Sequence, residues 1–183
     1  MSTVLTQPMT AADFWRLPET EKRRELVRGE VIETMPPGMF PGAIVANLVE
    51  LLRGWTKQGT DGYVGVEAGY ILERNPDTVR APDVSYVTSE RIQAVGIPEG
   101  FWEGAPDVAV EIISRNETAD EVREKVRDDL SAGAALVLTI YPRTREVIAH
   151  IPDGLARTFG PDASLEFPTA LPGFTCRVAE LFA

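Results

Sequence analysis

The chain has 183 residues, of which 44% are hydrophobic and 25% are charged. These values are typical of a single domain (1–183) with a full apolar core. The net charge of −10 counts against non-specific duplex binding, which depends on Lys and Arg neutralising phosphates. With one cysteine and one histidine, the chain has no internal disulfide or cysteine-rich zinc site, and a histidine-rich metal site or a Ser-His-Asp triad is disfavoured.

The first half of the chain predicts a helix, a hairpin and a second helix. Residues 10–22 read as a short opening helix, and 25–33 alternate in hydropathy about a central glycine, which indicates a hairpin. A loop rich in proline covers 35–42. Residues 43–57 follow as a helix, because their apolar residues recur at helical spacing.

The second half predicts strands around one further helix. Buried strands are expected at 63–72, 79–87, 108–114 and 135–141. A Thr-x-x-Glu capping box begins a helix at 118–132. Because this helix connects the third strand to the fourth, those two strands are expected to be parallel neighbours or close to it.

The C-terminal part predicts a second hairpin, with VIAHI and LARTF on either side of a Pro-Asp-Gly turn, and a short final helix at VAELFA. The expected fold class is therefore α/β: a central mixed β-sheet flanked by helices, with an additional N-terminal hairpin and a C-terminal β-hairpin.

Two carboxylates lie inside predicted buried strands: Asp83, which follows Pro82, and Glu111, in the apolar run VAVEII. A buried ionised carboxylate is costly unless it is paired or binds a metal. Mg²⁺ prefers oxygen ligands and needs only one or two carboxylates plus water and substrate phosphate. Asp83, Glu111 and the main-chain carbonyl of Ile112 form a candidate set, with Mn²⁺ as an alternative ion. Such an ion would activate water and neutralise a phosphate.

The competing interpretation is structural: Asp83 caps a turn after Pro82, and Glu111 pairs with an arginine. Lys125 likewise has a functional and a structural interpretation. It lies on the flank of the apolar stripe of helix 118–132, so its stem can lie along the sheet and bring the ammonium to the strand ends. Alternatively, it is exposed to solvent and pairs with Glu121 or Asp129 at helical spacing.

The segments RAPDVSYV, PDVAVEIIS and EVREKVRDDLSAG, followed by a strand and a Pro-Arg-Thr-Arg turn, resemble the Uma family of restriction endonucleases, in the PD-(D/E)XK nuclease superfamily. The resemblance covers nearly the whole chain and implies a restriction-endonuclease-like core. It makes Asp83 the superfamily aspartate and Glu111 its second acidic residue. The usual lysine position is occupied by Ile113, and Lys125 matches a lysine moved to the next helix.

By the same resemblance, Glu25 and Glu67 fall at acidic positions that could complete the metal site. Gly42 stands where many relatives carry a histidine, just before the 43–57 helix. If that histidine assists catalysis or substrate binding, its loss favours an inactive protein.

The leading hypothesis is a Mg²⁺-dependent endonuclease acting on DNA, favoured as a homodimer because a two-fold pair of sites suits two strands. The alternative is a nuclease-fold module that no longer cleaves and serves in binding or assembly. A hydrolase of another phosphate ester is a third possibility. No segment is apolar enough to span a membrane, and the N-terminal segment lacks a signal peptide. A cytoplasmic location is therefore expected.

Overall fold

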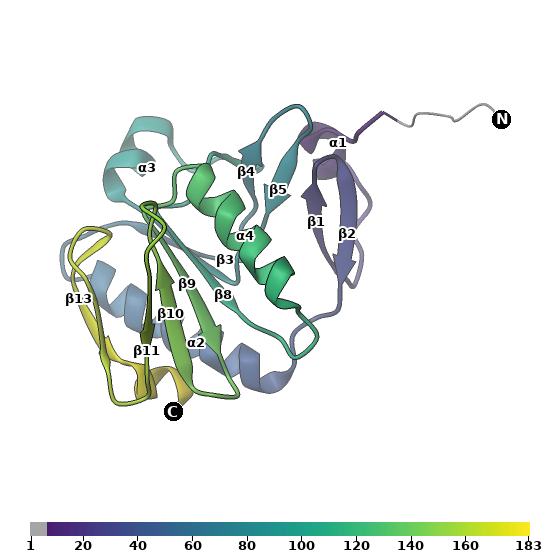
Figure 1. Cartoon of the computed structure of the whole chain (residues 1–183). Coiled ribbons are helices and arrows are strands. Elements are labelled where there is room, and N and C mark those ends of the chain that lie inside the picture. The colour runs from purple at the N-terminus through teal and green to yellow at the C-terminus, as the bar shows by residue number, and fades with distance from the viewer. Residues whose placement is uncertain (1–6) are drawn as a thin grey trace.

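The computed structural model describes residues 7–183. Residues 1–6, which belong to the predicted domain 1–183 and to the N-terminal segment, lie outside the described residues. Two β-sheets form the centre of the molecule (Figure 1). The larger sheet has the strand order β11-β10-β9-β8-β6-β3, and the smaller sheet has the order β2-β1-β5-β4-β7.

The strands of the larger sheet are β3 (Tyr63–Val66), β6 (Val84–Val87), β8 (Val108–Ile112), β9 (Leu136–Tyr141), β10 (Glu146–His150) and β11 (Ala156–Phe159). The smaller sheet contains β1 (Arg23–Val27), β2 (Glu30–Thr34), β4 (Tyr70–Glu73), β5 (Thr78–Arg80) and β7 (Trp102–Glu103). A separate hairpin is formed by β12 (Ser164–Phe167) and β13 (Leu171–Arg177). As predicted from the crossover helix, β8 and β9 pair in parallel.

The helices are α1 (Ala11–Trp15), α2 (Met39–Thr56), α3 (Ser89–Val95), α4 (Ala119–Ser131) and the 3₁₀ helix η1 (Val178–Phe182). In Figure 1, α4 crosses in front of the larger sheet and α2 lies behind it. The α2 side holds the main apolar core, which includes the buried side chains of Leu48, Val110 and Ile140. On the α4 side, Val126 packs with Ala109 and Val137. None of the helices in residues 7–183 has the length and hydropathy to cross a membrane.

Two predicted strands are each divided between the two sheets. The run predicted at 63–72 forms β3 in the larger sheet and β4 in the smaller one, and the run at 79–87 likewise becomes β5 and β6. Pro82 has no N–H for a ladder, and Glu67 has a φ of 50° that ends the extended conformation. The amide of Glu67 donates to the carbonyl of Asp83 at 3.4 Å, so both chains bend at the same place. Asp83 therefore lies at the corner where the sheets diverge.

Some predicted boundaries were also wrong. The opening helix ends at Trp15 instead of residue 22, because Pro18 disfavours a helical conformation of the residue before it. Helix α2 starts at Met39 instead of residue 43, since proline is tolerated in a first helical turn. Gly42 consequently lies inside α2, where an added Cβ would meet nothing within 4 Å. The β12–β13 hairpin, α3 and β7 were not predicted.

Candidate active site

The predicted carboxylates face each other across two neighbouring strands. In the antiparallel pairing of β6 with β8, Val84 is opposite Val110, so the same register places Asp83 opposite Glu111. Both are buried, at 7% and 4% exposure. The backbone N–H of Ile112 donates to Oδ2 of Asp83 at 2.7 Å. The amide of Ile112 thus holds Asp83 in place, and its carbonyl as a metal ligand stays a prediction.

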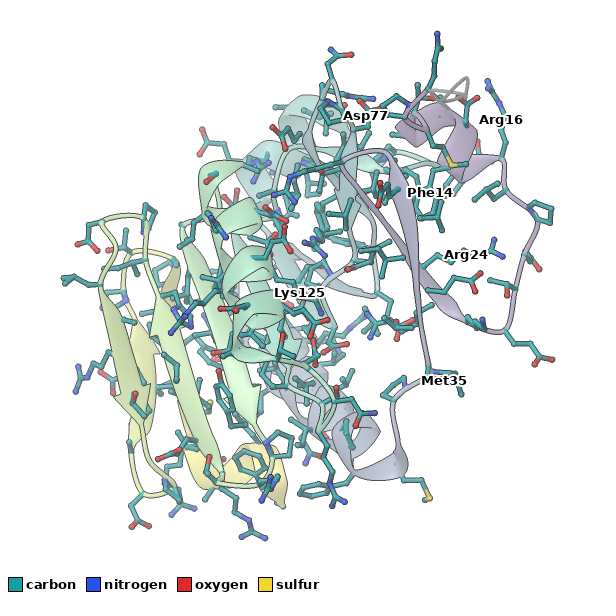
Figure 2. All side chains as sticks on the ribbon, turned by 45° about the vertical axis from the view of Figure 1, so that its right-hand side comes forward. Phe14, Arg16, Arg24, Met35, Asp77 and Lys125 are labelled. Atoms are coloured by element: carbon teal, nitrogen blue, oxygen red, sulfur yellow. The ribbon has the colours of Figure 1, made fainter. Side chains whose placement is uncertain are left out.

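Lys125 reaches this pair from helix α4. Its Nζ lies 3.0 Å from Oε2 of Glu111 and 2.9 Å from Oε1 of Glu117. Val122 and Val126 are buried against the sheet, which directs the flank of the helix toward the strand ends. Figure 2 shows Lys125 on the side of α4 that faces the N-terminal hairpin. The interpretation of Lys125 as an exposed residue paired with Glu121 or Asp129 was therefore wrong.

The electrostatics of the site depend on burial and on like charges held close together. Burial raises the pKa of Glu111 to about 8, and Asp83 and Glu25 add repulsion that Lys125 partly offsets. Burial acts to lower the pKa of Lys125, but the nearby carboxylates outweigh it and leave that pKa above its ordinary value. Lys125 is therefore a cation at neutral pH, able to donate hydrogen bonds but not to act as a base.

Asp83 also has a cationic partner. Nη1 of Arg23 lies 2.7 Å from Oδ1 of Asp83, and Nη2 donates to the carbonyl of Ala81 at 2.9 Å. Nε of Arg23 is 3.4 Å from Oε1 of Glu67, whose side chain is 44% exposed. Glu67 thus contacts the site through Arg23, and a direct role for it in metal binding stays a prediction.

Glu25 is held by hydrogen bonds to Arg80 and to the main chain, separate from those that hold Asp83 and Glu111. Its Oε2 accepts from Nη1 of Arg80 at 3.0 Å, and its Oε1 accepts from the amide of Ala81 at 3.1 Å. Arg80 also donates to Oδ2 of Asp128 at 2.7 Å. Glu25 lines the same cavity as Asp83 and Glu111, but these bonds fix it toward Arg80. Its place among the metal ligands also stays a prediction.

Most of these groups line one cavity of about 470 Å³, and Glu67 and Asp128 lie outside its lining. Charged side chains cover one wall: Arg23, Glu25, Arg80, Asp83, Glu111, Glu117, Glu121, Glu124 and Lys125. Apolar residues of β2, of the β2–α2 connection and of α2 form the other wall: Ile32, Met35, Pro36, Pro37, Pro41 and Val45. In Figure 2, Met35 lies where the chain leaves the hairpin toward α2. The charged wall has twice as many carboxylates as cations, so it is a site for positive charge.

A divalent cation fits the donors present. The Asp83 and Glu111 side chains offer hard oxygen ligands at neighbouring strand ends, and their mutual repulsion is what a cation would relieve. Within residues 7–183, no three His, Cys, Asp or Glu side chains are grouped closely enough to form a metal site alone. A metal here would therefore rest on two carboxylates and complete its shell with water and substrate, which Mg²⁺ accepts.

The sequence-based prediction missed Arg23, Arg80 and Glu117. Arg23 is two residues before Glu25 on a strand, so alternation already placed both on one face. Arg80 directly precedes Ala-Pro-Asp. Because a buried arginine is normally paired with a carboxylate, this position could have indicated an ion pair near Asp83. Glu117 lies in the loop before α4, where its orientation depends on a hydrogen bond from the amide of Ser114 at 2.7 Å. Nothing in the spacing of residues indicated that bond.

Comparisons with known proteins agree with this architecture. The family model described as "Uma2: Putative restriction endonuclease" matches residues 11–179. The crystal structure of a "putative nuclease belonging to DUF820" from Anabaena variabilis ATCC 29413 superposes with a TM-score of 0.81 at 25% identity. The match covers 96% of this chain and 98% of that one. No curated protein matches the chain. The predicted family resemblance and the restriction-endonuclease-like α/β fold are both confirmed.

Proposed function

Because the chain belongs to the Uma2 family of "putative restriction endonucleases", we propose that it is a metal-dependent DNA endonuclease. Asp83 and Glu111 hold a Mg²⁺ or Mn²⁺ ion, and Lys125 stabilises the phosphate undergoing attack. The observation that carries this proposal is the convergence of Lys125 on Glu111 at 3.0 Å from a separate helix. This contact supplies the cation that the strand motif lacks at Ile113.

Each residue has a defined task in this proposal. When bound, the ion neutralises negative charge on the phosphate and favours ionisation of a water molecule. Asp83 is oriented by the amide of Ile112, and Glu111 is oriented by Lys125. Lys125 retains Glu117 as a second partner, so its ammonium stays in place and charged while Glu111 binds the ion. It then donates to the oxygen on which negative charge develops.

The alternative function, a nuclease-fold module that binds but does not cleave, is favoured by two observations. Asp83 and Glu111 are already paired with Arg23 and Lys125, and Gly42 offers no side chain at the position of the family histidine. The two functions differ in one property. The enzyme loses activity when a single carboxylate of the pair is neutralised, whereas the module has no activity to lose.

The test is cleavage of supercoiled plasmid and of circular single-stranded DNA in Mg²⁺, in Mn²⁺ and in chelator. The wild-type protein should cleave with either metal and not with chelator. Glu111→Gln and Asp83→Asn should each reduce the rate by about 10²-fold or more. The matched control is Glu99→Gln, at an exposed loop position away from the cavity, which should cleave as wild type does. Equal activity of wild type and Glu111→Gln would disprove the proposal.

We also propose that the active form is a homodimer, because a two-fold pair of sites suits the cleavage of both strands of a duplex. Sedimentation in the presence of Mn²⁺ tests this. A monomer that nonetheless makes double-strand breaks in one encounter would contradict it.

A further inference from the structure

Arg23 occupies the position that a metal ion at Asp83 would require. Its guanidinium nitrogen lies 2.7 Å from Oδ1 of Asp83, while Oδ2 accepts the amide of Ile112 at 2.7 Å. Both oxygens of Asp83 are therefore engaged in hydrogen bonds within the protein. A divalent cation and a guanidinium repel each other strongly at such short range, so an ion bound at Oδ1 favours movement of Arg23 away from Asp83.

Arg23 can move without losing all of its partners. Glu67 lies 3.4 Å from its Nε and is half exposed, so it can keep the guanidinium nearby when Asp83 is released. The other cations of the cavity are also held by carboxylates, and Arg80 is more deeply buried than Arg23. Arg80 is 5% exposed between Glu25 and Asp128, and Lys125 is held by Glu111 and Glu117.

The chemistry of the displaced group suits a phosphate. A guanidinium presents a planar fork of N–H donors that matches two phosphate oxygens, and it keeps its charge at any working pH. Burial acts to lower the pKa of Arg23, but Asp83, Glu67 and Glu111 outweigh that effect and leave the pKa raised. Once released from Asp83, this charge faces a cavity in which substrate would meet six carboxylates.

We propose that Arg23 is an exchangeable counter-ion of Asp83 that binds the substrate phosphate once a divalent cation displaces it. This inference rests on the proposed function, since it assumes a metal at Asp83 and Glu111. It adds a substrate-binding residue to that site. It also gives a reason for the order of events: phosphate is bound only after metal has released the arginine.

The test measures Mn²⁺ affinity by calorimetry for wild type, Arg23→Gln and Arg24→Gln. Arg24 is the matched control, because it is the next residue on β1, it is 23% exposed against 24% for Arg23, and it pairs with Glu33 outside the cavity. Arg23→Gln should bind Mn²⁺ about tenfold more tightly than wild type, because a competing charge is gone. Arg24→Gln should bind as wild type does. A purely structural arginine would have the opposite effect, since its loss would weaken the site.

A second measurement tests whether Arg23 binds the phosphate of the substrate. With saturating Mn²⁺ and a labelled oligonucleotide carrying phosphorothioate linkages, Arg23→Gln should bind DNA about tenfold more weakly than wild type. Arg23→Lys keeps the charge but not the fork, so it should retain wild-type Mn²⁺ affinity and still bind DNA more weakly. This variant also serves if Arg23→Gln does not fold.

The outcomes separate the two proposals. If wild type binds no Mn²⁺, the proposed function fails, and this inference fails with it. If wild type binds Mn²⁺ but Arg23→Gln binds it no more tightly than Arg24→Gln does, only the exchange is overturned. If Mn²⁺ affinity rises but DNA affinity is unchanged in both Arg23 variants, the phosphate-binding role is overturned.

Discussion

In the proposed function, Lys125 supplies from a helix the positive charge that the strand lacks, because Ile113 occupies the position two residues after Glu111. The first prediction follows from its place 3.0 Å from Glu111. Lys125→Met should lower the cleavage rate by about 10²–10³-fold, the effect of removing one donor that stabilises transition-state charge. The mutant should keep its fold, which circular dichroism would check. The rate is measured on plasmid in saturating Mn²⁺.

The control for this prediction is Lys57→Met, which removes the charge of an exposed lysine beyond the end of α2. Cleavage by Lys57→Met should equal that of wild type. If Lys125→Met also cleaves as wild type does while Glu111→Gln is inactive, the assignment of the displaced lysine is wrong.

Asp129 is a second unusual carboxyl on α4. It is 1% exposed, and neither of its oxygens has a hydrogen-bond partner among the described residues. Burial raises its pKa from 3.8 to about 7, with Arg80 and Lys125 opposing and Glu25 adding repulsion. At a pH between 3.8 and about 7, Asp129 therefore keeps its proton in the folded protein and loses it in the unfolded chain. Its contribution to stability is therefore complete below about pH 4 and lost as the pH rises to about 7.

The second prediction concerns Asp129→Asn, whose amide has the shape of the protonated acid but does not titrate. The free energy of unfolding of this variant should increase relative to that of wild type by up to about 1.4 kcal/mol per pH unit between pH 4 and 7. Above pH 7 the difference between the two proteins should stay constant. Urea unfolding at several pH values measures this. The control is Asp120→Asn, which makes the same change on the same helix at a side chain that is 93% exposed, so that an effect of burial can be distinguished from an effect of the substitution itself. A pH-independent difference for Asp129→Asn would show that the carboxyl titrates normally.

At this scale the sequence predicted the pair Asp83 and Glu111 because acids inside apolar strands are rare enough to stand out. It suggested Lys125 because the helical stripe placed that residue beside the sheet. It did not reveal Arg23 or Glu117, whose roles depend on how a distant hairpin and a loop approach the strand ends. Strand alternation placed Arg23 on the same face as Glu25, but it gave no sign of how closely that face approaches Asp83.

Among the elements, α4 has the most direct effect on the site, since it carries Lys125 and begins at a capping box. The Thr118 hydroxyl accepts the amide of Glu121 at 3.3 Å, and the Glu121 carboxylate accepts the amide of Thr118 at 2.7 Å. The third prediction is that Thr118→Ala lowers the free energy of unfolding by about 1 kcal/mol. The carboxylates proposed to bind the metal do not lie on this helix, so Mn²⁺ affinity should stay within twofold of wild type.

Denaturant unfolding and calorimetry check this prediction, with Thr175→Ala on the outer face of β13 as an exposed control. A loss of Mn²⁺ affinity in Thr118→Ala larger than the loss of stability would mean that the start of α4 takes part in binding the metal.

The elements show where prediction from the sequence stops. Helix α4 and strands β8 and β9 were correctly placed because each has a single, uninterrupted hydropathy pattern. The runs at 63–72 and 79–87 have continuous strand patterns too, yet each bends into a second sheet. In the 79–87 run the residues on both sides of the bend are buried, so burial alone does not mark it. In the 63–72 run the bend falls where the chain becomes exposed at Val66 and Glu67. Only Pro82 marked the corner, and the same residue was equally compatible with a simple turn.

For the molecule as a whole, the net charge of −10 and the acidic cavity both lower the affinity for DNA. The fourth prediction is that affinity for random duplex is weak at physiological salt without metal and increases when Mn²⁺ is added, because few phosphates can be neutralised by the protein alone. Fluorescence anisotropy of a labelled duplex over a salt series measures this. Tight metal-free binding with a steep salt dependence would reveal a concentrated basic face and would weaken the account.

The central claim is that Asp83 and Glu111 hold a divalent cation, and the most direct test is anomalous diffraction from crystals grown with Mn²⁺. One strong peak is expected about 2.1 Å from a carboxylate oxygen of each residue, as octahedral coordination requires, with the guanidinium of Arg23 moved away from Oδ1 of Asp83. A peak only at other carboxylates, or no peak while Arg23 and Lys125 stay paired with Asp83 and Glu111, would contradict it.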